Sequence, residues 1–186
     1  YKKLTKDLWE VSCKQAKEVV IRYNYYAADL NAGSTYLDEH QLYVNPVNCC
    51  LYLPNRLDES CELELVLPND YQVATAMRAH KNLQFKTKNF DELADQPFIA
   101  SANLKKLAYK VGKTNFYLWF QGELKGDEKR LINDFKAFSE EQSKLFKGFP
   151  FDEYHFLFHI LPYKAYHGVE HCDSTVICLG PSYDVL

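Results

Sequence analysis

The chain has 186 residues, enough for one large domain or for one domain and part of a second. Hydrophobic residues make up 47% of it and charged residues 25%, which is the balance of a folded globular protein. The net charge is −3 and no block of Lys or Arg occurs, which argues against nucleic acid or an anionic membrane as a partner. No run of eighteen apolar residues occurs, so we expect no membrane-spanning helix.

The first two thirds of the chain carry one strand signal after another. Aromatic residues reach 15%, and aromatic and β-branched side chains fit a pleated, half-buried surface. CELELVLP (61–68) shows the clearest alternation, and segments such as PND and HKN between the runs have turn chemistry. The predicted strands cover 19–26, 42–54, 61–68, 71–77, 83–88 and 115–122. FDELADQP (90–97) predicts a single helical turn that ends at Pro97.

The pattern then changes to that of a helix. From Asp127 to Phe146 the apolar residues recur every three or four positions, with Asp127 as the N-cap and Gly148 just beyond the end. Alternation returns in FDEYHFLFHILP, which predicts a strand, and Ser174 to Cys178 predicts another. We therefore expect a mostly antiparallel α+β fold, with a β-sandwich-like domain over 1–123 and a second domain over 124–186, whose incompleteness is implied only by the resemblance described below.

Six Cys residues occur, without a C-x-x-C pair or a regular framework of spacings. We expect reduced and mostly buried thiols, with the adjacent Cys49 and Cys50 on opposite faces of a strand. No signal peptide is recognisable, but the chain begins at Tyr1 rather than Met, so the compartment stays open between cytoplasm and periplasm.

The stretch HGVEH (167–171) matches H-x-x-E-H, a zinc-protease signature that needs a helix to bring both imidazoles to one metal. Gly168 and Val169 are poor helix formers, and the segment that follows has a strand pattern. We therefore expect no zinc site here. His155 and His159 are also four apart, but on a strand they lie about 13 Å from each other, too far to share a metal. Both are expected to be packed histidines.

Five segments resemble one family when they are taken in order. They are YNYYAADLNAGSTYLDEHQLYVNP, CELELVLPNDYQVATAM, NFDELADQPF, LFKGFPFDEYHFLFHILP and YHGVEHCDST. Together they are similar to the glycyl aminopeptidases, zinc metallopeptidases that carry a PDZ domain and are relatives of the aminopeptidase N and thermolysin clan. The resemblance spans nearly the whole chain.

The resemblance implies a β-rich N-terminal domain followed by the first helix and strands of a thermolysin-like catalytic domain. Its zinc motif H-E-x-x-H, the downstream Glu ligand and the PDZ domain would all lie beyond residue 186. This fragment alone is therefore expected to bind no metal and to have no catalytic residue and no activity.

The resemblance also gives a role to Gly168, Val169, Glu170 and His171, which match a G-x-E-H exopeptidase motif. In that family the strand backbone pairs with the peptide substrate, and the Glu takes its free α-ammonium. A carboxylate and an ammonium form a charge-assisted hydrogen bond, and Gly lets a ligand approach the backbone closely. From the residues alone, Glu170 would more often be a solvated loop carboxylate.

Two hypotheses of different classes follow. The first is a fragment of a zinc aminopeptidase that acts on peptides with N-terminal Gly or Ala. The second is a non-catalytic β-sandwich module that binds peptides or proteins. If the catalytic domain is incomplete, the helix over 127–146 would expose apolar surface that favours self-association.

Overall fold

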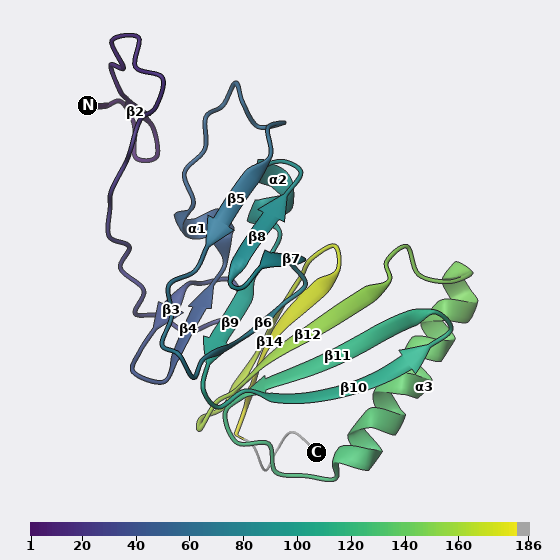
Figure 1. The fold of residues 1–186 in the computed structure, drawn as a ribbon. Helices are drawn as coiled ribbons and strands as arrows, with labels where there is room; N and C mark the ends of the chain where they lie inside the picture. The colour runs from purple at the N-terminus through teal and green to yellow at the C-terminus, as the bar shows by residue number, and fades with distance from the viewer. Residues whose placement is uncertain (182–186) are drawn as a thin grey trace.

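The computed structural model describes residues 1–181, and it stacks β-sheets in layers with one long helix on the outside (Figure 1). The N-terminal segment leaves this body as an extended arm. Within the described residues, no helix is both long enough and apolar enough to cross a membrane.

The first hundred residues form two small antiparallel sheets and a hairpin-like pair in the arm. The pair consists of β1 (Lys2–Lys3) and β2 (Trp9–Glu10). A four-stranded sheet has the order β3 (Tyr36–Leu37), β4 (Gln41–Val44), β9 (Phe98–Ser101), β6 (Gln72–Thr75). A three-stranded sheet has the order β5 (Cys61–Glu64), β8 (Gln84–Thr87), β7 (Ala79–Lys81).

The remaining strands form one five-stranded mixed sheet. Its order is β10 (Lys105–Val111), β11 (Thr114–Gln121), β12 (Glu153–Ile160), β14 (Ser174–Gly180), β13 (Ala165–Glu170). The central strand β12 runs parallel to both of its neighbours, whereas the two outer pairs are antiparallel. The expectation of a mostly antiparallel α+β fold is confirmed, with this parallel centre as an addition.

The long helix α3 (Glu128–Phe146) is the crossover between the parallel strands β11 and β12. The Asp127 side chain accepts hydrogen bonds from two backbone N–H groups of the first turn, and Lys147 ends the helix in a left-handed conformation. Leu131, Ile132 and Phe135 pack against one face of the sheet. The helix predicted over 127–146 is confirmed, because its periodicity and both end signals are local.

The other face of the five-stranded sheet packs on the four-stranded sheet. Leu157 of β12 and Val176 of β14 are fully buried there against Tyr43 of β4 and Ile99 of β9. Because residues alternate along a strand, β12 places His155 and His159 on this inner face and its Phe residues under α3. Both histidines are buried, as expected.

Gly122 ends β11 at a point where only glycine fits. Its φ is +101°, and a Cβ atom would lie 2.3 Å from the carbonyl oxygen of Ile160. The chain can therefore turn away from the sheet directly beside the end of β12.

Two predicted strands are wrong. Residues 19–26 are an exposed, irregular part of the arm, because alternation alone does not make a strand where no described strand lies beside it. The prediction over 42–54 holds only for its start, since α1 (Pro46–Cys49) begins at Pro46, where the fixed φ of proline suits the first position of a helix.

The expected cysteine environment is also partly wrong. The cysteines are unpaired, but only Cys178 is buried, while Cys13 and Cys172 are exposed. Cys49 and Cys50 lie at the end of α1 rather than in a strand.

The division proposed at 123/124 falls between β11 and β12, which are neighbouring strands of the same sheet. Two strands from before the division therefore join three from after it.

Candidate functional site

The G-x-E-H stretch forms the outer strand of the five-stranded sheet. β13 pairs with β14 along one side, and no described strand pairs with its other side. A strand edge of this kind offers backbone N–H and C=O groups to an extended peptide. The expectation that HGVEH is not helical is therefore confirmed.

Alternation along β13 separates the side chains of the motif. Glu170 lies opposite Thr175 of β14, so both side chains leave the sheet on the face that carries α3. Val169 and His167 leave on the opposite face, where Val169 packs against the core between the two sheets. His167 accepts a hydrogen bond from the backbone N–H of Ala32 through its Nδ1 atom at 3.2 Å. His167 and Glu170 thus cannot act on one metal ion.

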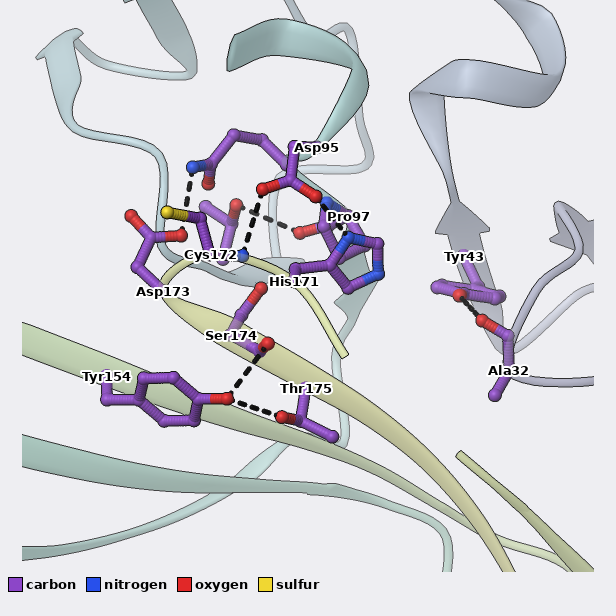
Figure 2. A network of polar contacts seen from close by, with 12 residues as sticks. Ala32, Tyr43, Asp95, Pro97, Tyr154, His171, Cys172, Asp173, Ser174 and Thr175 are labelled. Carbon is purple, nitrogen blue, oxygen red and sulfur yellow. Dashed lines mark hydrogen bonds and ion pairs between the residues drawn. The ribbon is translucent and has the colours of Figure 1, made fainter. Parts of the chain in front are cut away.

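The short helix α2 (Phe90–Ala94) and the residues after it hold the turn that follows β13 (Figure 2). The Asp95 carboxylate lies 2.9 Å from Nδ1 of His171, and its second oxygen accepts the backbone N–H of Cys172, also at 2.9 Å. The Gln96 amide donates to Asp173 at 3.0 Å. Burial raises the pKa of Asp173 above its ordinary value. These bonds join residues more than seventy positions apart.

The bond to Asp95 also decides what the rest of the His171 ring can do. A carboxylate oxygen accepts, so Nδ1 carries a proton and Nε2 is the ring nitrogen that remains without this partner. Nε2 is buried and has no hydrogen-bond partner among residues 1–181.

A hollow of about 320 Å³ lies where α1, α2 and the end of β13 meet. Glu170, His171 and Val169 form one wall, and the other residues come from the first hundred positions: Asn45, Val47, Asp91, Ala94 and Asp95. No Lys or Arg lines it. The Asn45 side chain is buried, and its Oδ1 atom has no partner in the described part of the chain.

The hollow therefore presents hydrogen-bond acceptors and negative charge. Glu170, Asp91 and Asp95 bring carboxylates to its lining, and the Asn45 Oδ1 atom is a buried acceptor in one of the lining residues. A group that only donates and carries positive charge, such as a primary ammonium, is the chemical complement of this set.

A second polar contact steadies the start of β14. The Tyr154 hydroxyl of β12 donates to the Ser174 carbonyl at 3.1 Å and also bonds the Thr175 hydroxyl (Figure 2). Burial raises the pKa of Tyr154, so the hydroxyl remains protonated at neutral pH. Ser174 and Thr175 thus organise the strand next to Glu170.

The structure brings Val169, Glu170 and His171 together at the hollow, whereas Gly168 lies one position further along the strand. Sequence reasoning missed Asn45, Asp91 and Asp95. Asn45 lies in YVNP, at the end of the first resembling segment, and Asp91 and Asp95 lie in NFDELADQPF. Nothing in these sequences indicates that the three residues are close to residue 170.

Residues 1–181 bring together no three His, Cys, Asp or Glu side chains in an arrangement that could hold a metal ion. The zinc that the resemblance implies therefore finds no ligand set in this part of the chain.

Comparisons with known proteins agree with the fold. The chain is similar to an aminopeptidase N family protein of Idiomarina loihiensis, with 30% identity and a TM-score of 0.76 over 82% of this chain and 27% of that one. It also shares its fold with the M1 zinc metallopeptidase of Deinococcus radiodurans, at 12% identity and a TM-score of 0.50, over 77% of this chain and 37% of that one. The chain thus spans well under half of either relative. No curated protein matches it.

The family model described as the Peptidase M61 N-terminal domain matches residues 1–102, which is more than half of the chain. By this match, the chain belongs to the M61 peptidase family.

Proposed function

We propose that this chain is the N-terminal part of a zinc aminopeptidase of the glycyl aminopeptidase kind, and that the hollow beside β13 receives the free N-terminus of a peptide. The observation that carries the proposal is the acidic lining of the hollow at the end of β13, where Glu170, Asp91 and Asp95 occur without any Lys or Arg. The ammonium would donate to these groups while the peptide backbone extends along the open edge of β13.

The preference for a small N-terminal residue, glycine or alanine, follows from the resemblance to the glycyl aminopeptidases. The hollow of about 320 Å³ is large enough to receive such a terminus.

In this proposal the chain's own residues bind and orient the substrate. Glu170 holds the cationic end, and β13 sets the register of the peptide. The zinc and the residues that activate water come from the sequence after residue 186, together with a PDZ domain.

Titration of the chain with glycyl-glycinamide, followed by the backbone amide signals of 168–171 in NMR spectra, tests the binding step. We expect saturable shifts with this peptide and none with N-acetylglycyl-glycinamide, which has the same backbone but no ammonium. Glu170→Gln should weaken binding about tenfold or more, because it removes a charge-assisted hydrogen bond. Glu64→Gln is the matched control, since Glu64 is exposed on β5 and does not line the hollow. Equal binding of both peptides would refute the proposed site.

A non-catalytic peptide-binding module is the second candidate, because the open edge of β13 and the acceptors would bind a peptide without any chemistry. The coding sequence after Leu186 separates the two candidates. An H-E-x-x-H motif there, with hydrolysis of glycyl and alanyl p-nitroanilide that falls in the Glu170→Gln protein, supports the enzyme. Peptide binding without that motif supports the module.

A further inference from the structure

A second and larger cavity, of about 760 Å³, lies away from the peptide hollow, where β11 and β12 end. Gln121 and His159 line it from these two strands, and Gln41 lines it from the start of β4. The loops 28–31 and 161–163 complete its wall. None of these residues lines the peptide hollow.

Three buried residues in the lining of this cavity carry polar side-chain atoms without a hydrogen-bond partner among residues 1–181. His159 is 1% exposed, and neither of its ring nitrogens has a hydrogen-bond partner among residues 1–181. Gln41 and Gln121 are each 8% exposed, and the Oε1 atom of each also lacks a partner there. A buried polar atom without a partner costs about 1–3 kcal/mol, so proteins rarely leave one, and still more rarely leave several together.

The buried end of the cavity is uncharged. Burial lowers the pKa of His159 to about 3, and the Tyr43 ring packs edge-on against it at a centroid distance of 4.7 Å. The neutral ring has one donor and one acceptor, and each glutamine amide also offers both.

The acidic side chains around the cavity do not change this character. Asp38 lines it, but one carboxylate oxygen accepts the backbone N–H groups of His40 and Gln41, and the other accepts the Tyr36 hydroxyl. Asp29 is exposed. No Lys or Arg lines the cavity, so nothing there would neutralise an anion.

We propose that this cavity is a binding site for a small, uncharged molecule that carries several hydroxyl or amide groups. Such groups donate and accept at the same time, as do Gln41, Gln121 and the neutral His159. The cavity volume falls within the range of ligand pockets. Tyr36 and Tyr163 add aromatic surface at its wall.

Four probes test the ligand class. N-acetylglycinamide is neutral, N-acetylglycine has nearly the same size and is anionic, and glycinamide is smaller and cationic. Methyl α-glucopyranoside is a neutral probe with hydroxyl groups. Saturation-transfer NMR detects binding, and the backbone amide signals of Gln41, Gln121 and His159 locate it. We expect saturable shifts of these signals with at least one neutral probe. The neutral probe that binds more tightly shows whether the site prefers hydroxyl or amide groups. The charged probes should cause weaker shifts or none. No neutral binding, or equal binding of the charged probes, overturns the proposal.

A substitution assigns the binding to the cavity. Gln121→Leu should weaken neutral-probe binding about fivefold by removing one hydrogen-bonding group. Gln72→Leu is the matched control, because Gln72 is exposed on β6 and does not line the cavity. Gln41→Leu gives a second variant if Gln121→Leu does not fold. Unchanged binding in a folded cavity variant overturns the proposal. Glu170→Gln should leave neutral-probe binding intact, which separates this site from the peptide hollow.

Discussion

At the scale of single residues, Gly168 occupies a strand position where the described fold leaves room for a side chain. A Cβ atom there would meet only the Val176 carbonyl oxygen, at an ordinary contact distance of 3.7 Å. Gly122 is the opposite case, because its φ is positive and an added methyl group would lie 2.3 Å from the Ile160 carbonyl oxygen. The described fold thus does not require glycine at 168, and under the proposed function its role is to let a peptide approach β13.

Gly168→Ala should therefore fold normally and bind peptide poorly. Alanine is favoured over glycine in a strand by about 0.5–1 kcal/mol, so the free energy of unfolding should stay the same or rise. Affinity for glycyl-glycinamide should fall, because the methyl group lies beside the path of the bound backbone. Denaturant unfolding and the NMR titration measure the two effects separately.

Gly122→Ala is the contrasting variant. Steric overlap with the Ile160 carbonyl should lower the free energy of unfolding by about 2 kcal/mol or more. A Gly168→Ala protein that loses as much stability would show that its glycine serves the fold rather than a ligand.

At the scale of secondary-structure elements, the local signals of a segment decided how well it could be predicted. The helix 128–146 has its N-cap at Asp127 and its periodicity within its own residues. The stretch 19–26 alternates as a strand does, yet no strand of residues 1–181 pairs with it. Whether such a partner exists depends on residues far away in the sequence.

The residues of the candidate site also differ in how far the sequence could predict them. Glu170 could be singled out because the motif around it is continuous in sequence. Asn45, Asp91 and Asp95 reach the same hollow only through the packing of α1 and α2 against the turn after β13. The cavity lined by residues 41, 121 and 159 was beyond prediction for the same reason.

The helix α3 has an apolar flank that the described fold does not cover. Phe138 and Leu145 are two helical turns apart and are 54% and 73% exposed. We expect the chain to self-associate through this flank, because exposed apolar surface of this kind favours contact with a second copy.

Phe138→Glu combined with Leu145→Glu should shift the chain to a monomer, since charge on the flank opposes its burial. Sedimentation velocity over a concentration series measures the association. Tyr26→Glu is the control, because Tyr26 is 89% exposed on the N-terminal arm. An unchanged distribution of species in the α3 variant would exclude the flank as the contact.

At the scale of the whole molecule, two buried histidines should make stability fall steeply in acid. Burial lowers the pKa of His155 to about 4 and that of His159 to about 3. An unfolded histidine titrates near pH 6.5, so below that pH the unfolded chain binds two protons that the folded chain does not. The free energy of unfolding should therefore decrease by up to about 2.7 kcal/mol per pH unit between roughly pH 6 and pH 4.

His159→Gln should remove about half of this slope, which denaturant unfolding at a series of pH values would measure. His80→Gln should leave it unchanged, because His80 is exposed on β7 in the folded chain as well. A slope that is the same in all three proteins would mean that groups other than the histidines control acid unfolding.

The core between the two large sheets has a consequence for the order in which the chain can fold during synthesis. Tyr43 and Ile99 belong to the part matched by the family model, but they are buried against Leu157 and Val176, which are translated much later. While the ribosome is still making α3, one side of the four-stranded sheet lacks its cover and must face water or a chaperone. Native packing of the first domain should thus be complete only when β12 and β14 have left the ribosomal tunnel, so the end of the family match is not the end of a cooperative folding unit.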